Sequence, residues 1–198
     1  MRITNAEDYN ESRDTIARDW SNYMLSTFPE SSWLFIPNVG TKAVEYIKKW
    51  NINVLILSGG EHIGVHPERD TTELELLKYA IHENISVIAI CRGLQLVHKF
   101  YGGKVLKGNE FFVKKHQSTT HPIKIAGNTF KVNSYHGNVL DENSVHKIFR
   151  ILARCTTDSS IEGLESDNIL AMMWHPERVD QISIWNKKLI EEFLSKYG

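Results

Sequence analysis

The stretch "VIAICRGLQLV", Val87 to Val97, joins a short apolar run to an amphipathic one and places a cysteine at the junction. Residues 86–90 predict a strand covered on both faces, because the run is almost unbroken by polar side chains. Residues 93–103 predict a helix that ends in glycines. Cys91 therefore lies on a strand-to-helix turn, where it is either a buried core thiol or a nucleophile held on a tight turn.

The neighbours of Cys91 favour the nucleophile. Such a turn requires strained backbone angles and small residues nearby, and the positions two before and two after the cysteine are Ala89 and Gly93. The helix that follows points its N-terminal amides and positive dipole end at the sulfur, which favours the thiolate. We expect the backbone N–H of Arg92 to donate to an oxyanion.

Apolar and amphipathic segments alternate along the first half of the chain. Strands are predicted at 1–4, 33–37 and 53–58, and helices at 7–27, at 41–51 with Thr41 as cap, and from Thr71 or Thr72 onward. This alternation predicts an α/β fold with a mostly parallel, doubly wound sheet. Short alternating strands between 104 and 175 predict a small antiparallel extension, and 180–197 an amphipathic helix. We expect a single domain over 1–198.

A second candidate group is "MMWHPER", residues 172–178. His175 ends an apolar strand and Glu177 follows two residues later, so period-2 geometry puts both side chains on one face. The carboxylate can then hold one imidazole nitrogen while the other faces the thiol, as in a nucleophile–base pair. The alternative is a surface His-Pro-Glu turn, which the nearby cysteine turn disfavours.

Glycines follow a third buried strand in "LSGGEH", residues 57–62. Glycine lets the backbone approach a ligand, so we expect Gly59 to line the site and Gly60 to donate a second hydrogen bond to an oxyanion. A phosphate loop is a competing hypothesis, although both common glycine patterns for it are absent here, and a plain tight turn is another. Because strand ends meet at one edge of an open α/β sheet, these glycines, Cys91 and His175 are expected to gather there.

The composition is that of an ordinary globular protein of 198 residues with a net charge of −1. This balance predicts neither a nucleic-acid partner nor a membrane partner. The two cysteines, Cys91 and Cys155, provide no disulfide framework and favour a reducing compartment. The N-terminus is too polar for a signal peptide, and no apolar run is long enough to span a bilayer. We therefore expect a soluble, cytoplasmic protein.

These motifs together resemble the class I glutamine amidotransferase superfamily over nearly the whole chain. The resemblance implies a flavodoxin-like sheet and a Cys-His-Glu triad formed by Cys91, His175 and Glu177. Gln95 matches a glutamine four residues after the nucleophile, whereas Ala89 replaces the usual glycine two residues before it. Within the superfamily the chain is most similar to the γ-glutamyl hydrolase branch, on "YNESRDTIARDW" (9–20), "HPERD" (66–70), "AICRGLQ" (89–95), "VNSYHG" (132–137) and "WHPE" (174–177).

The branch implies a substrate pocket as well. Ser134, Tyr135 and His136 are expected to line the glutamyl pocket together with Gln95, and for His136 a satisfied polar loop residue is the alternative. The compact length and the N-terminus are similar to members that act on nucleotide-linked γ-glutamyl amides in bacterial capsule synthesis. No cofactor is implied.

Nine histidines raise the hypothesis of a metal site. His62 and His66 are four residues apart, but Gly64 and Pro67 argue against the helix that would align them. Neither an HExxH motif nor a cysteine pair is present, so no catalytic metal is expected. A basic stretch with two phenylalanines, between 104 and 124, is either a solvated face or a receiver for an anionic leaving group.

The predicted function is a cysteine-dependent hydrolase that cleaves a γ-glutamyl amide through a glutamyl thioester and releases glutamate. One rival is a glutaminase subunit that delivers ammonia to a separate synthetase, which would then be its partner. A second rival is a non-catalytic or redox-sensing relative with a reactive thiol. The His-Pro-Glu segment disfavours the sensor, because a sensor needs no oriented base.

Overall fold

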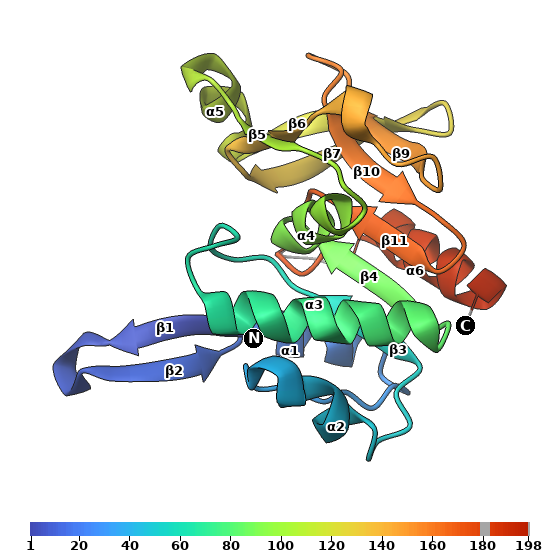
Figure 1. Cartoon of the computed structure of the whole chain (residues 1–198). Helices are drawn as coiled ribbons and strands as arrows, with labels where there is room; N and C mark the ends of the chain where they lie inside the picture. The colour runs from blue at the N-terminus through green and yellow to red at the C-terminus, as the bar shows by residue number, and fades with distance from the viewer. Residues whose placement is uncertain (179–182, 198) are drawn as a thin grey trace.

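Seven strands form one mixed sheet in the computed structural model, which describes residues 1–178 and 183–197 (Figure 1). In this part of the chain their order is β3-β4-β11-β10-β9-β6-β7. The bounds are β3 (Val54–Leu57), β4 (Ser86–Ile90), β11 (Ile169–Met172), β10 (Ile161–Glu165), β9 (Arg150–Cys155), β6 (Gln117–Ile125) and β7 (Asn128–Tyr135). Because β4 and β11 are buried at every position, they form the centre of the core.

The parallel part of the sheet consists of β3, β4 and β11, and all other neighbouring strands are antiparallel. The predicted α/β class and the presence of antiparallel strands are confirmed. The sheet is mixed rather than mostly parallel, because four of the six neighbouring pairs in the described sheet are antiparallel. The last strand of the expected antiparallel extension is β11, which instead pairs in parallel with β4. Residues 166–168 join β10 to β11, and so short a connection permits only an antiparallel pair.

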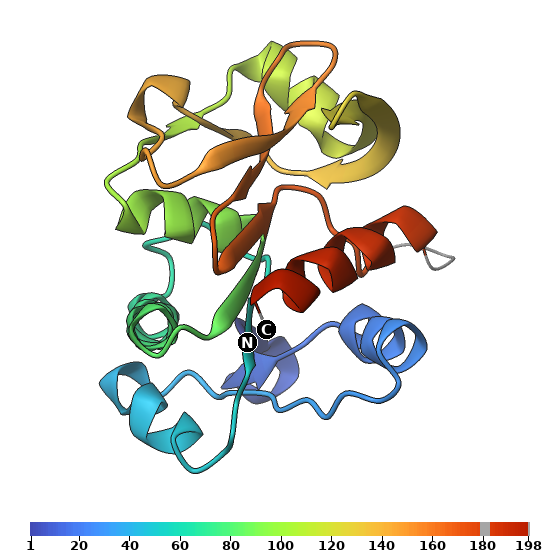
Figure 2. The same cartoon turned by 90° about the vertical axis from the view of Figure 1, so that its right-hand side faces the viewer.

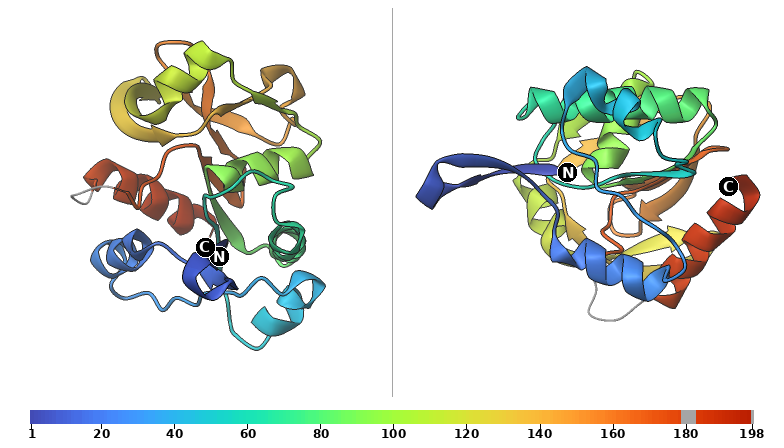
Figure 3. Two further views of the ribbon diagram at one scale, coloured as in Figure 1. Left: turned by 90° about the vertical axis from the view of Figure 1, so that its left-hand side faces the viewer. Right: turned by 90° about the horizontal axis from the view of Figure 1, so that it is seen from below.

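Helices cover both faces of the sheet (Figures 2 and 3). One face carries α3 (Pro67–His82) and α4 (Arg92–Phe100), and the other carries α1 (Arg18–Thr27) and α6 (Ile184–Tyr197). The predicted C-terminal helix corresponds to α6, and its first predicted residues, 180–182, lie outside the described residues. None of the described helices combines the length and hydropathy that a membrane crossing requires.

The N-terminal region differs from the prediction of one long helix over 7–27. Strand β1 (Arg2–Ala6) pairs with β2 (Glu11–Thr15) as an antiparallel hairpin that projects from the body of the molecule (Figure 1). A short 3₁₀ turn, η1 (Glu7–Tyr9), ends at Asn10, whose φ of 47° reverses the chain. Helix formation therefore starts only at α1.

Three further expectations about the N-terminal half are wrong. The apolar segment 33–37 contains no strand and instead lines, with β3, an apolar cavity of about 460 Å³. The predicted helix 41–51 shrinks to η2 (Gly40–Lys42) and α2 (Ala43–Ile47), and no side chain caps it. Helix α3 begins at Pro67 rather than near Thr72, because proline suits the first helical position and the Thr72 hydroxyl accepts a hydrogen bond from the Gly40 N–H.

The antiparallel part contains elements that the sequence did not predict. Helix α5 (Glu110–His116) is capped by Asn109, whose side chain accepts a hydrogen bond from the Phe112 N–H. Strands β5 (Val105–Lys107) and β8 (Asn138–Leu140) form a small separate pair, and η3 (Glu142–Ser144) follows β8. These elements lie around the antiparallel end of the main sheet (Figure 1).

Gly93 permits the close contact between α4 and β3. A Cβ atom at this position would lie 2.3 Å from the Leu57 carbonyl oxygen, which cannot move without shifting the strand. We expect Gly93→Ala to lower the free energy of unfolding by about 1–3 kcal/mol, as overpacking of a core does. Urea unfolding measures this change. Gly137→Ala is the control, because its added methyl group meets only Val113 Cγ2 at 3.5 Å, and equal losses in both variants would contradict the packing argument.

Candidate active site

Cys91 occupies the turn between β4 and α4 in a backbone conformation that few non-glycine residues adopt, with φ 50° and ψ −98°. Its N–H donates to the Met172 carbonyl oxygen at 2.7 Å, and its own carbonyl accepts from the Gln95 N–H at 3.1 Å. Such strained residues cost on the order of 1–3 kcal/mol and concentrate at functional sites. The predicted strained strand-to-helix turn is therefore present.

The ionisation of Cys91 differs from the expected thiolate. Burial raises the pKa of the thiol to about 12, and the negative charge of Glu177 adds to this effect. The positive charge of Arg178 and a hydrogen bond from the Arg92 N–H act in the opposite direction but are weaker. A helix N-terminus stabilises an anion by only about 1 kcal/mol, which is too little to offset full desolvation. The resting thiol is thus protonated at neutral pH.

His175 follows β11 at the same sheet edge as Cys91, because β11 and β4 are parallel neighbours. Its Nδ1 lies 2.7 Å from Glu177 Oε1, and both side chains are buried. The carboxylate accepts the Nδ1 proton, so the lone pair of the neutral ring is on Nε2. No hydrogen bond joins the Cys91 sulfur to this ring within the described residues.

Asn133 on β7 holds the backbone around His175, a role that its sequence position did not indicate. Its side-chain oxygen accepts from the His175 N–H at 2.9 Å. Its NH₂ group donates to the carbonyl oxygens of His175 and Arg178, both at 2.8 Å. Asn133 stands in the quoted "VNSYHG" motif, one residue before the predicted pocket residues, so the motif indicated the strand but not this residue.

Tyr135 is the one predicted pocket residue of β7 whose side chain reaches the site. Its ring meets the His175 ring edge to face at 5.5 Å, and the Arg178 guanidinium lies 4.7 Å from its centroid. The tyrosine is 41% exposed, so it forms the outer wall beside the imidazole.

Ser134 and His136 point away from His175, so the structure does not bring their side chains to the candidate active site. Both are buried, and Ser134 donates its hydroxyl to the His116 carbonyl oxygen. His136 Nδ1 donates to the Asn138 carbonyl oxygen at 2.9 Å. Side chains alternate along a strand, so Tyr135 and its neighbours necessarily face opposite ways.

Gln95 lies one turn into α4 and is buried. Its side-chain oxygen accepts from Asn138 Nδ2 at 3.1 Å, and its NH₂ group approaches the Met173 sulfur at 3.8 Å. The structure therefore gives Gln95 protein partners on two sides, and its predicted contact with substrate stays a prediction.

Gly59 packs directly on the imidazole of His175. A Cβ atom at Gly59 would lie 2.5 Å from His175 Cε1, so only glycine fits between the strand and the ring. Gly60 has φ 146° and lies against the guanidinium of Arg69, which donates to the carbonyl oxygens of Ser58 and Gly59. The loop is thus anchored beside the site, while oxyanion donation by Gly60 stays a prediction.

The side chain of Arg92 turns away from the sulfur. Its guanidinium forms ion pairs with Asp70 and Glu73, and Glu73 also binds the buried Arg69 at 2.9 Å. Arg92 therefore reaches Cys91 only through its backbone N–H. This network fixes the first turn of α4 against α3, and it depends on contacts that no local motif predicts.

The large apolar cavity is separate from this chemistry. Ser58 and Pro176, which adjoin Gly59 and His175 in sequence, line part of it, but neither Cys91 nor His175 does. His62 and His66, the pair that the sequence argued against as metal ligands, are placed differently: His62 Nδ1 lies 3.1 Å from Asn138 Nδ2, and His66 directly precedes α3.

Comparisons with known proteins support the family resemblance. Residues 35–196 match the model of the family described as "Glutamine amidotransferase class-I". The γ-glutamyl-CDP-amidate hydrolase of Campylobacter jejuni is 23% identical, over 98% of this chain and 95% of that protein. A glutamine-hydrolysing GMP synthase of Borrelia garinii is 28% identical over 70% of this chain, which spans 27% of that larger protein.

Among solved structures, a glutamine amidotransferase from Thermotoga maritima has the same fold. The TM-score is 0.59 at 14% identity, over 90% of this chain and 78% of that chain. The family match covers most of the sequence, including Cys91, His175 and Glu177. The chain therefore belongs to the class I glutamine amidotransferase family.

Proposed function

We propose that this protein is a cysteine-dependent hydrolase of γ-glutamyl amides. The observation that carries the proposal is the meeting of a strained, buried cysteine and a carboxylate-held histidine at one sheet edge. A nucleophile, a base and a group that orients the base are the minimum set for acyl transfer through a covalent intermediate. The similarity to a hydrolase of γ-glutamyl-CDP-amidate supports the choice of bond.

The first step follows from the protonated state of the thiol. As Cys91 attacks the γ-carbonyl carbon, its proton moves to Nε2 of His175, and Glu177 stabilises the resulting imidazolium. The backbone N–H groups of Arg92 and Gly60 donate to the oxyanion of the tetrahedral intermediate. His175 then gives the proton to the leaving nitrogen, the C–N bond breaks, and a glutamyl thioester remains on Cys91.

The second step returns the enzyme to its starting state. His175 takes a proton from water, which attacks the thioester carbon, and the C–S bond breaks to release glutamate. The thiolate regains its proton from the same imidazolium. Every proton is thus carried by one histidine, so the clamp formed by Asn133 and Glu177 is expected to be essential.

The proposed substrate is a γ-glutamyl amide with an anionic leaving group, for example a nucleotide-linked amidate. The similarity to the Campylobacter relative supports an anionic group. The competing candidate is a glutaminase that passes ammonia to a synthetase, which the similarity to a GMP synthase supports. The two candidates differ in one requirement: a stand-alone hydrolase must hold its oxyanion donors in place without a partner protein.

The nucleophile is tested by Cys91→Ala. This variant should lose all measurable glutamate release while its thermal unfolding stays close to wild type, because the sulfur sits at a turn. Cys155→Ala is the matched control, since Cys155 is also buried but lies on β9, and it should stay active. A sensor without catalysis would release no glutamate even as the unaltered chain.

The raised pKa of Cys91 predicts a pH dependence of alkylation. Because the pKa is about 12, the thiolate fraction should grow about tenfold per pH unit between pH 7 and pH 9. The rate of Cys91 labelling by iodoacetamide, followed by peptide mass spectrometry, should show this rise without a plateau. A plateau already near neutral pH would mean that the resting thiol is ionised, contrary to the effect of burial.

Glu177→Gln tests the orientation of the imidazole. The amide keeps the shape but no longer stabilises the imidazolium, so kcat should fall by roughly 10⁴ with little change in KM, as in comparable triads. Glu192→Gln, an exposed change on α6, should leave both constants unaltered. If the activity of Glu177→Gln stayed within a few-fold of wild type, Glu177 would have only a structural role in the turn.

Substrate preference separates the hydrolase from the amidotransferase subunit. The purified chain should cleave a γ-glutamyl nucleotide amidate with kcat/KM roughly 100-fold above that for glutamine, because remote contacts contribute to the chemical step. γ-Glutamyl-γ-aminobutyrate serves as the comparison without a phosphate. A preference for glutamine, or activity only with a second protein present, would favour the ammonia-delivering alternative.

A further inference from the structure

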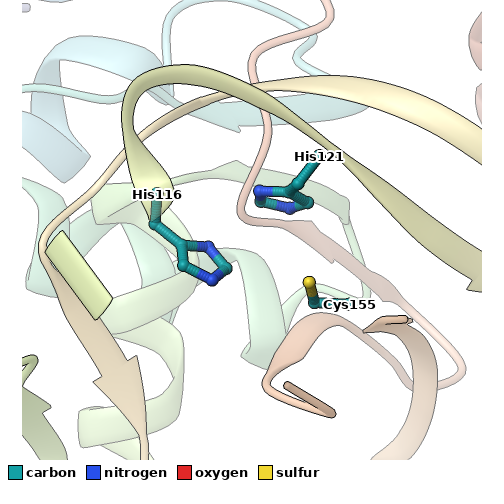
Figure 4. A group of neighbouring side chains, drawn as sticks. All are labelled: His116, His121 and Cys155. Atoms are coloured by element: carbon teal, nitrogen blue, oxygen red, sulfur yellow. The ribbon is translucent and has the colours of Figure 1, made fainter. Parts of the chain in front are cut away.

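Three buried histidines and a buried glutamate meet in the antiparallel part of the sheet, on the side of β7 that faces away from His175. His116 ends α5, His121 lies in β6, His136 follows β7 and Glu162 lies in β10. None of the four is more than 5% exposed. Figure 4 shows two of the rings together with Cys155, which comes from β9.

Hydrogen bonds at the outer edge of the cluster fix two of the rings. His116 Nε2 lies 2.7 Å from Asp158 Oδ2, so this nitrogen donates its proton to the carboxylate. His136 Nδ1 lies 2.9 Å from the carbonyl oxygen of Asn138, which can only accept. In the neutral rings, His116 Nδ1 and His136 Nε2 therefore carry lone pairs, and both point inward.

The inward atoms make no hydrogen bond within the part of the chain that the structure describes. These atoms are His116 Nδ1, His136 Nε2, both nitrogens of His121 and Glu162 Oε2, and all of them are buried. An unpaired buried polar atom costs about 1–3 kcal/mol. Lone pairs that face a carboxylate also repel it, so the cluster requires a positive charge at its centre.

The spacing fits a metal ion better than direct ion pairs. The nitrogens of His116, His121 and His136 lie 3.5, 3.4 and 3.6 Å from oxygens of Glu162. Charge-assisted N–H···O bonds are about 2.7–2.9 Å long, so these contacts are too long for them. Ligand atoms about 2.0–2.1 Å from a tetrahedral Zn²⁺ are about 3.3–3.4 Å from one another, close to these three distances between a histidine nitrogen and a Glu162 oxygen.

We propose that His116 Nδ1, His121 Nε2, His136 Nε2 and the carboxylate of Glu162 bind one Zn²⁺ ion. Four protein ligands leave no open position, as in structural zinc sites, so the ion would tie α5, β6, β7 and β10 together. Asp158 on His116, the Asn138 carbonyl on His136 and the Ser160 hydroxyl, 3.2 Å from Glu162 Oε1, supply the outer hydrogen bonds that orient metal ligands. The site is independent of the proposed hydrolysis.

Cys155 offers a different ligand set. Its sulfur and nitrogens of His116 and His121 lie within 4.8 Å of one another, as do ligand atoms of His116, His136 and Glu162. The sulfur already contacts the Thr157 hydroxyl at 3.1 Å, whereas Glu162 Oε2 accepts no hydrogen bond from any described residue. The unsatisfied atoms therefore favour the glutamate, and the two sets predict different spectra.

The test uses the full-length, untagged Cys91→Ala protein, so that the thiol of the candidate active site cannot bind the metal. After chelation and dialysis, added Zn²⁺ should bind at one equivalent per chain, measured by mass spectrometry of the metal. At 100-fold excess over Kd it should raise Tm by about 5–10 °C. Co²⁺ in its place should give the visible bands of a tetrahedral site without a thiolate-to-cobalt charge-transfer band.

Variants assign the ligands. Glu162→Gln and His121→Gln should lose the bound equivalent and the rise in Tm, whereas His82→Gln, an exposed histidine on α3, should keep both. If the parent protein bound no more zinc than the His121→Gln variant, the proposal would be overturned. A thiolate band that disappears in Cys155→Ser would overturn the glutamate ligand set. If the ligand variants fail to fold, the cobalt spectrum of the parent protein decides between these outcomes.

Discussion

The hydrogen bond from the Cys91 N–H to the Met172 carbonyl oxygen, 2.7 Å long, joins the ends of two central strands at the point where the chain turns into α4. It holds Cys91 in its strained conformation, and the absent side chain of Gly93 lets the helix start against β3. His175 lies three residues beyond Met172, and Asn133 binds its backbone N–H and carbonyl oxygen. The positions of the Cys91 sulfur and the His175 imidazole are therefore set mainly by main-chain hydrogen bonds rather than by contacts of the side chains themselves.

Strand β7 separates two polar systems that lie back to back. Asn133 and Tyr135 face the histidine of the candidate active site, while Ser134 and His136 face the buried cluster of histidines. A change in the cluster must therefore reach the other face through the position of the strand itself. Such coupling acts through backbone placement and requires no contact between the two sets of side chains.

Much of the central architecture could be predicted from local sequence. Unbroken apolar runs indicated β3 and β4, and the small neighbours of Cys91 indicated the strained turn, whereas β11 was expected in the antiparallel extension. The two-residue spacing of His175 and Glu177 indicated their hydrogen bond, which the structure contains at 2.7 Å. These features depend only on the spacing of residues along the chain and on the size of their side chains, and both can be read from a single sequence.

The remaining features depend on contacts between distant segments. The hairpin of β1 and β2 requires Asn10 in a left-handed conformation, which the helix-like spacing of residues 7–27 hid. The side of β7 on which His136 lies depends on register, and the direction of the Arg92 side chain depends on Asp70 and Glu73 from α3. The ligands of the buried cluster are spread over 116–162 without a helical spacing, so a search for short metal motifs could not find them.

The two-residue turn between β6 and β7 restricts where this chain can accept inserted or deleted residues. Ala126 and Gly127 both have positive φ, 47° and 86°, and close the hairpin directly after the Ile125–Asn128 pair. A single inserted or deleted residue that shifted this register would exchange the faces of the whole strand, carrying Asn133 into the interior and His136 out to solvent. Natural variation and loop grafting are therefore expected to spare this turn and to accumulate instead at the tip of the projecting N-terminal hairpin (Figure 1).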